Sequence, residues 1–301
     1  MNIEHYDQPS FIYDSNQSSG EEVSFLPRIF DIHSLPCKMI FPHWHDDFEF
    51  IYLLSGKLAF HINHKTYVAS AGEGFFINAG QVHYAQQYEE YDCRFLSFQI
   101  SPSMLYQNEQ DPVFQKYFLP ISTNPSFCHM TLTPKVPWQK YILENIKKII
   151  ALCQEKNYGY ELKVYHFIHE NFYYVLQNIA SLPDLSKKER KDIERIKQGM
   201  IYLDQTYVQK HTLEDISKAC SLSRSECCRL FQRILNCSPI DYLIKIRIQN
   251  SLPLIVAHDL SMTEIAKRTG FSGSSYFSET FKKVMGHTPR EFYKQCCIEK
   301  K

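Results

Sequence analysis

Residues 261–293, SMTEIAKRTGFSGSSYFSETFKKVMGHTPREFY, form the stretch that decides the fold of the C-terminal part of this chain. A short helix is expected to begin at Ser261, and a turn follows at Gly270. A glycine suits that turn because it adopts positive φ without steric cost. A longer helix then follows and ends at Thr288-Pro289. The stretch therefore predicts a helix-turn-helix unit.

The same order of features occurs about fifty residues earlier, in residues 212–239. Phe231 and Phe281 are 50 residues apart, and so are Pro239 and Pro289. One unit copied twice explains these equal spacings better than chance. We therefore expect two helix-turn-helix units in the last part of the chain.

Hydroxyl side chains stand three residues before carboxylates at the expected starts of three helices. This is the spacing of the capping box, in which the two side chains bond the free N–H groups of the first turn. The pairs are Thr212 with Asp215, Ser223 with Glu226, and Ser261 with Glu264. The capping chemistry thus agrees with the predicted helix starts.

The longer helix of each unit has an apolar face and a polar face. Arg and Gln can form paired hydrogen bonds to guanine or adenine edges, while Lys and Arg can hold phosphates. A solvated face of an ordinary helical bundle would explain one such helix, but not two matched units. The expected core face consists of Leu230, Phe231, Tyr276, Phe277 and Phe281. The expected DNA-binding residues are Arg224, Ser225, Cys228, Arg229, Gln232 and Arg233 in the first unit and Ser274, Ser275, Ser278, Glu279, Lys282 and Lys283 in the second.

The segment from Ile240 to Ile255 is helical in pattern and joins the two units. About sixteen residues at roughly 1.5 Å each span about 24 Å. Such a spacer would let both longer helices enter successive major grooves on one face of DNA, which lie about 34 Å apart. Pro253 removes one backbone hydrogen bond of this segment, so we expect the helix to kink or to end early there.

Charge is divided unequally along the chain, although the formal net charge is zero. Residues 1–185 hold 12 Lys or Arg and 20 Asp or Glu, a net charge of −8, whereas residues 186–301 hold 21 and 13, a net charge of +8. The basic half points to a polyanionic partner, and double-stranded DNA suits the helix-turn-helix units. The sequence contains no signal peptide and no apolar run of membrane-spanning length, so we expect a cytoplasmic protein with reduced cysteines and no membrane partner.

These residues resemble the AraC/XylS family of bacterial transcription regulators. The first unit fits from Leu213 to Arg247, and the resemblance covers about 110 residues. It implies a paired helix-turn-helix domain that contacts promoter DNA and usually activates transcription, with RNA polymerase as a partner. The strongest match lies in Ile265-Ala266, Gly270-Phe271-Ser272, Tyr276-Phe277-Ser278, Phe281-Lys282-Lys283, Gly286, Thr288-Pro289 and Phe292-Tyr293.

The resemblance also assigns roles by position. Arg229 matches a base-contacting arginine in the first recognition helix of the family. Glu279 stands where many members carry arginine, which predicts either weaker binding by the second unit or readout of a cytosine amine. Pro253 is a second departure, and it bears on the angle between the two units.

From about Leu26 to Ile100 the sequence alternates between short apolar runs and turn residues such as Gly56, which predicts the short strands of a β-sandwich or barrel. Two clusters among them have the spacings H-x-H-x3-E-x6-G and G-x5-N-x-G-x2-H. Both resemble the two cupin motifs, which place three histidines and one glutamate inside a small β-barrel. The matching residues, which we call the His–Glu cluster, are His43, His45, Glu49 and His83.

Three roles are open for the His–Glu cluster. Its side chains suit hydrogen bonds to a small-molecule effector such as a sugar, beside aromatic rings such as Tyr52 and Phe76. They can also hold Fe, Mn, Ni or Zn, which would make the chain a metal-dependent isomerase or dioxygenase joined to a DNA reader. A third role is structural, in which they only satisfy one another. We expect an effector site with no cofactor and no catalysis.

The order of these segments predicts an α+β protein of two domains. We expect an irregular tail in residues 1–25, a cupin-like effector domain in residues 26–135 and a helical pair in residues 136–182. The pair has more apolar surface than one sheet edge needs, which predicts a homodimer. A linker in residues 183–191 then leads to the DNA-binding domain in residues 192–301.

Overall fold

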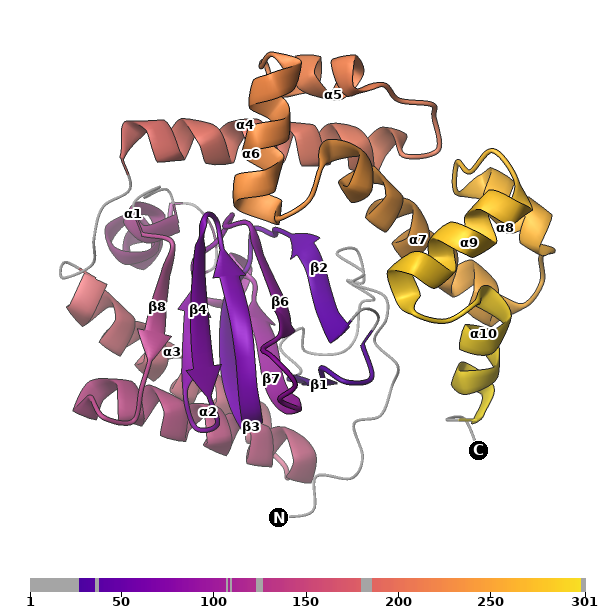
Figure 1. Ribbon diagram of the computed structural model, residues 1–301. Coiled ribbons are helices and arrows are strands. Elements are labelled where there is room, and N and C mark those ends of the chain that lie inside the picture. The colour runs from indigo at the N-terminus through magenta and orange to yellow at the C-terminus, as the bar shows by residue number, and fades with distance from the viewer. Residues whose placement is uncertain are drawn as a thin grey trace. The chain divides into compact units, whose positions relative to one another are not determined.

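The chain divides into two compact domains, mainly residues 42–190 and the residues from 191 onward. The first is rich in strands and the second is helical, so the predicted α+β architecture with two domains is confirmed (Figure 1). The expected tail, residues 1–25, lies outside the described residues. The computed structural model describes residues 27–35, 38–106, 108, 110–122, 127–179 and 186–298.

The N-terminal domain contains eight strands in its described part, and the long strand β3 is their hub. One end of β3 pairs with β5 and β7, and the other end pairs with β4 and β6. β1 extends the first sheet beyond β7, β8 extends it beyond β5, and β2 pairs with β6. The strands are β1 (Arg28–Asp31), β2 (Met39–His43), β3 (Phe48–Ile62), β4 (Lys65–Ser70), β5 (Gly74–Ile77), β6 (His83–Gln87), β7 (Cys93–Ile100) and β8 (His129–Leu132).

β3 runs unbroken through Gly56, where the sequence predicts a turn between two strands. Gly56 has φ +72°, and a Cβ there would lie 1.6 Å from the backbone oxygen of Asp92. The register against β7 also shifts between Leu53 and Ser55. A bulge thus lies just before Gly56, at the point where the strand passes from the first sheet to the second.

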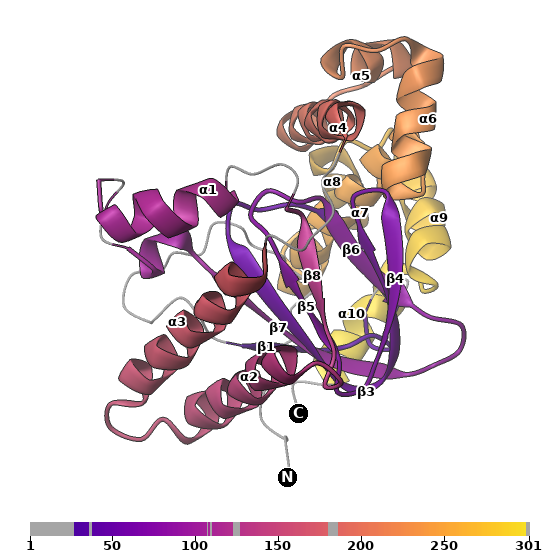
Figure 2. The same ribbon diagram turned by 90° about the vertical axis from the view of Figure 1, so that its left-hand side faces the viewer.

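Two helices cover one face of the first sheet, and both are present where the sequence predicts a helical pair (Figure 2). They are α2 (Pro137–Glu155) and α3 (Tyr160–Asn178). Phe48 and Phe50 of β3 pack on Phe172 of α3, with ring centroids 5.0 and 5.9 Å apart. Because side chains alternate along a strand, Glu49 between them points to the other face.

A short helical segment follows β7 and was not predicted from the sequence. It consists of a 3-10 turn η2 (Pro102–Met104), a π-helical turn η3 (Phe114–Phe118) and α1 (Leu119–Ser122). Each is too short to show a helical period in the sequence. Phe114, Phe118 and Ile121 nevertheless enter the same core as Phe172.

The C-terminal domain consists of helices in its described part, and α7 joins the two helix-turn-helix units (Figure 1). The helices are α4 (Lys187–Thr206), α5 (Leu213–Ala219), α6 (Arg224–Leu235), α7 (Pro239–Ala257), α8 (Met262–Arg268), α9 (Ser274–Met285) and α10 (Pro289–Ile298). No helix among the described residues is long and apolar enough to cross a membrane.

Two expectations for this domain are corrected. Residues 187–191 belong to α4 and not to the linker, because Ser186 and Glu189 form a capping pair: Glu189 accepts from Ser186 N at 2.7 Å, and Ser186 Oγ accepts from Glu189 N at 3.3 Å. The helix also does not end early at Pro253, since α7 continues to Ala257.

Candidate DNA-binding surface and ligand site

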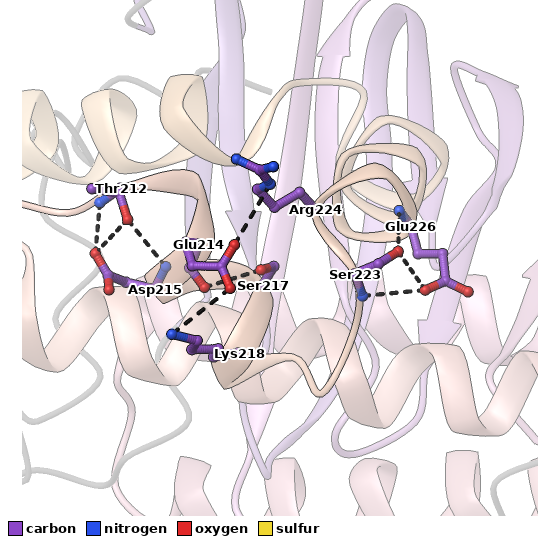
Figure 3. A network of polar contacts seen from close by, with 8 residues as sticks. All are labelled: Thr212, Glu214, Asp215, Ser217, Lys218, Ser223, Arg224 and Glu226. Carbon is purple, nitrogen blue, oxygen red and sulfur yellow. Dashed lines mark hydrogen bonds and ion pairs between the residues drawn. The ribbon is translucent and has the colours of Figure 1, made fainter.

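Reciprocal capping boxes begin the helices of the first helix-turn-helix unit (Figure 3). The Thr212 amide donates to Asp215 Oδ2 at 2.8 Å, and the Asp215 amide donates back to Thr212 Oγ1 at 3.3 Å. Ser223 and Glu226 make the same exchange at 3.2 and 3.3 Å. These hydrogen bonds lower the pKa of Asp215 and of Glu226 below their usual values. The predicted helix starts are therefore confirmed for this unit.

The second unit repeats this chemistry at its first helix and turns at Gly270. Ser261 N donates to Glu264 Oε2 at 2.8 Å, and the Glu264 amide donates to Ser261 Oγ at 3.3 Å. Gly270 has φ +82°, and a Cβ there would lie 2.7 Å from the backbone oxygen of Val208. The turn thus needs glycine for its conformation and for the space it leaves.

Each expected DNA-binding residue lies on the outer side of its recognition helix. None is buried: Cys228, Ser274 and Ser278 are partly exposed and the others are exposed. The core side of α6 holds Cys227, Leu230, Phe231, Ile234 and Leu235, and that of α9 holds Phe277, Thr280, Phe281 and Met285.

Several of these polar residues already have partners within the chain. Arg233 Nη2 lies 2.6 Å from Asp192 Oδ2 on α4, and Arg224 Nε lies 3.5 Å from Glu214 Oε2 (Figure 3 shows the second pair). Gln232 donates to Asn236 Oδ1 at 2.9 Å. Arg233 therefore links the recognition helix to α4 in the DNA-free chain.

Tyr276 differs from its predicted place in the core. Its side chain is 47% exposed, and its ring touches Phe271 edge-on with centroids 5.8 Å apart. The helical period places it beside Ser275 and Glu279 on the outer face of α9. Tyr276 is thus a surface residue of the second recognition helix that sequence reasoning missed, because an aromatic at helical spacing is usually buried.

Arg247 on α7 ties both units to the loop after α4. Its guanidinium donates to the backbone oxygens of Tyr207 at 2.8 Å and Gln209 at 2.7 Å. It also lies 5.8 Å from the ring centroid of Phe271, in the turn of the second unit. This junction accounts for an arginine at this position, which sequence reasoning matched only by resemblance.

The four members of the His–Glu cluster come together in the N-terminal domain. His43 ends β2, His45 lies in the next loop, Glu49 lies near the start of β3, and His83 begins β6. Glu49 Oε2 is 2.9 Å from His83 Nε2 and 3.5 Å from His45 Nε2. The ring of His43 is 4.2 Å from that of His83, centroid to centroid.

Electrostatics hold the carboxylate of the cluster in its charged form. Burial alone would raise the pKa of Glu49, but the charges and hydrogen bonds of His83 and His45 hold it well below its usual value. Burial opposes a charged His45 as well, yet the bond to Glu49 and the nearby carboxylates raise the pKa of this imidazole. The cluster therefore pairs a charged carboxylate with the imidazole of His45, whose charged form it stabilises.

β7 adds a polar residue to the cluster that sequence reasoning missed. Ser97 Oγ donates a short hydrogen bond to Glu49 Oε1. Gln99 pairs in register with Glu49 and so shares its face of the sheet. The sequence did contain a signal for this polar face. In residues 93–100, Ser97 and Gln99 stand two positions apart and therefore lie on the same face of the strand.

Tyr52 and Phe76, the aromatic rings expected beside the cluster, lie on the opposite face of the sheet. Both belong to the core under α2 and α3, and Phe76 touches Phe172 with centroids 5.7 Å apart. The argument for a sugar ligand that came from these two rings is therefore lost.

The donor set of the cluster fits a divalent transition-metal ion. Possible ligand atoms of its three histidines all lie within 4.8 Å of one another. Imidazole nitrogens and a carboxylate oxygen are ligands of Zn, Fe, Ni and Mn sites in proteins. The cysteines give no such group: those described are free thiols, and all but Cys228 are buried.

Comparison with known proteins agrees with both halves of this picture. Residues 216–295 match the family described as "Helix-turn-helix domain", and residues 38–130 match the family described as "AraC-like ligand binding domain". The chain is 34% identical over 252 residues to the uncharacterized HTH-type transcriptional regulator YdeC of Bacillus subtilis (strain 168). This alignment covers 84% of this chain and 85% of that protein.

A second relative is the HTH-type transcriptional activator RhaR of Mannheimia succiniciproducens, 24% identical over 255 residues, with 84% of this chain and 87% of that protein covered. Among solved structures, ToxT from Vibrio cholerae O395 aligns with a TM-score of 0.47 and 16% identity. That alignment covers 91% of this chain and 98% of that chain.

Proposed function

Because the chain belongs to the AraC family of transcription regulators, we propose that α6 and α9 are the helices that read base pairs in promoter DNA. One observation carries this proposal. The same helix-turn-helix unit occurs twice, and each copy presents a longer helix whose outer face is polar and exposed. Side chains on such a face reach base edges when the helix lies in a major groove.

Arg229→Ala tests the assignment of the first recognition helix. Loss of one bidentate arginine contact should cost about 1–3 kcal/mol in binding and relax the preference at one base pair. Arg290→Ala, an exposed arginine at the start of α10, is the matched control and should leave that preference unchanged. The measurement is a binding titration against promoter fragments that carry each substitution in turn. Unchanged specificity in Arg229→Ala would remove this residue from base reading.

The His–Glu cluster is proposed as the effector site, which controls how the helix-turn-helix units occupy DNA. An effector can act in this way only if it binds one arrangement of the protein better than another. The relatives described above are regulators, so we propose that the cluster binds a ligand and does not turn it over.

A homodimer formed through α2 and α3 completes the proposal. Tyr141 and Leu162 expose 55% and 76% of their surfaces on these helices, and Tyr173 exposes 57%. Large apolar side chains on one helical pair are typical of a protein interface. The dimer would act on transcription in the cytoplasm, through contact with RNA polymerase at the promoter.

A further inference from the structure

The histidines of the His–Glu cluster are oriented as metal ligands are. His45 Nδ1 lies 3.0 Å from the backbone oxygen of Asp47, and His83 Nδ1 lies 2.8 Å from that of Gln81. A carbonyl oxygen can only accept, so each Nδ1 donates to its carbonyl and each Nε2 is turned toward Glu49. Metal-binding histidines are fixed by the same kind of outer hydrogen bond.

The carboxylate is held from its far side and faces these nitrogens. Ser97 occupies Glu49 Oε1, which leaves Oε2 toward the Nε2 atoms of His45 and His83. Glu49 and His83 are only 3% and 1% exposed. A buried carboxylate needs a positive charge beside it. Protonated imidazoles can supply that charge, and a metal ion bound to the same nitrogens would replace their protons.

The spacing of the cluster fits one ion. A metal that bonds imidazole nitrogens at about 2.0–2.1 Å keeps any two of them within about 4.2 Å. The possible ligand atoms of the three histidines lie within 4.8 Å of one another before any ion binds. Movements of less than about an ångström close this difference.

Two apolar neighbours of the cluster exclude water from it. Glu49 pairs across the sheet with Ile77, and the ring of Phe60 stacks over His83 with centroids 6.4 Å apart. Both neighbours are buried. An apolar shell of this kind limits solvent access and lowers the local dielectric around a metal site.

We propose that the His–Glu cluster binds one divalent first-row transition-metal ion, and that this ion is the signal to which the N-terminal domain responds. The response rests on the proposed regulatory function, whereas the binding does not. Glu49 is flanked in β3 by Phe48 and Phe50, which pack on Phe172 of α3. A shift of the carboxylate toward an ion would therefore reach the helical pair through direct contacts.

Titration with Co(II) tests the binding, using the full-length protein without a His tag after treatment with a chelator. We expect one equivalent per chain and visible absorption bands of a nitrogen- and oxygen-ligated ion. His83→Gln and Glu49→Gln should abolish this uptake, and Ser97→Ala should weaken it about 10- to 100-fold. His61→Gln is the matched control, since this histidine of β3 stacks on Tyr84 outside the cluster and should leave uptake unchanged.

The outcomes separate binding from regulation. Wild-type protein that takes up no stoichiometric Co(II) would overturn the metal site, whether or not the variants fold. Uptake that persists in a folded His83→Gln protein would overturn it as well.

Footprinting on the promoter of the chain's own gene, with and without Zn(II), tests the response. A footprint that changes with Zn(II) in the wild type but not in His83→Gln supports it. A bound ion with an unchanged footprint would overturn the signalling part alone. No footprint under any condition would instead refute DNA binding at that promoter and leave the metal site standing.

Discussion

Replacing Gly270 with alanine is expected to destabilise the C-terminal domain, because the turn of the second helix-turn-helix unit leaves no room for a β-carbon. Gly270 has φ +82°, and the added carbon would lie 2.7 Å from the backbone oxygen of Val208 and 2.8 Å from that of Tyr207. Both oxygens belong to the main chain, so no side-chain rotation can relieve the contact. The penalty has a conformational part and a steric part.

Replacing Gly286 with alanine separates the conformational part of this penalty from the steric part. It ends α9 with φ +80°, yet nothing lies within 4 Å of a Cβ built there. Gly286→Ala should therefore cost only the left-handed conformation, about 1–2 kcal/mol of the free energy of unfolding. Gly270→Ala should cost the same amount plus overpacking of about 1–3 kcal/mol, and thus about 2–5 kcal/mol in total.

Urea unfolding of the full chain measures this difference. Circular dichroism follows the helices, most of which lie in the C-terminal domain. Trp44 and Trp138, the two tryptophans of the chain, report the N-terminal domain by fluorescence. Gly273→Ala serves as the control without positive φ or a steric contact, since Gly273, the N-cap of α9, has extended backbone and open space at its Cβ position. It should cost no more than about 1 kcal/mol, from the poorer capping by alanine. Equal losses from the Gly270 and Gly286 substitutions would refute the steric argument.

Acid should weaken the helix starts of the same domain. Hydrogen bonds from Ser261 lower the pKa of Glu264 below its usual 4.5, so their stabilisation is present above that pH and is lost as the pH falls through the lower folded value. The urea midpoint should fall between about pH 5 and pH 3, and less steeply in Ser261→Ala; parallel curves would contradict the assignment. Arg247→Met should cost about 1–3 kcal/mol of stability, since it removes two charged hydrogen bonds, and should shorten the DNA footprint. Arg290→Met should do neither, and a full-length footprint in the Arg247 variant would show that the junction does not set the spacing of the two units.

Features that depend on residues close in sequence were predictable. The capping boxes at Thr212, Ser223 and Ser261 join residues three apart, so the sequence contains both partners. The turn at Gly270 is a local requirement for positive φ in the same way. The start of α4 was missed although Ser186 obeys this rule, because the charged residues after it were interpreted as a linker.

Features that depend on strand pairing were predictable only in part. Tyr52 stands three residues after Glu49, and alternation along a strand already places it on the opposite face. The face of Phe76 follows from its pairing with Phe50, a register that the sequence does not contain. The need for glycine at position 56 likewise comes from the close backbone of Asp92, far along the chain.

The contacts of the recognition helices change how DNA binding is divided between the two units. Basic residues favour the first unit, yet Arg233 is held at 2.6 Å by Asp192, which is only 14% exposed. A DNA contact by Arg233 would leave a partly buried carboxylate without its partner, which is costly. The exposed ion pair of Arg224 is worth only about 0–1 kcal/mol and releases its arginine readily. We therefore propose that Arg233 braces α6 and that base reading in the first unit falls mainly to Arg229. The exposed ring of Tyr276 would then give the second unit a larger share of DNA binding than charge alone predicts.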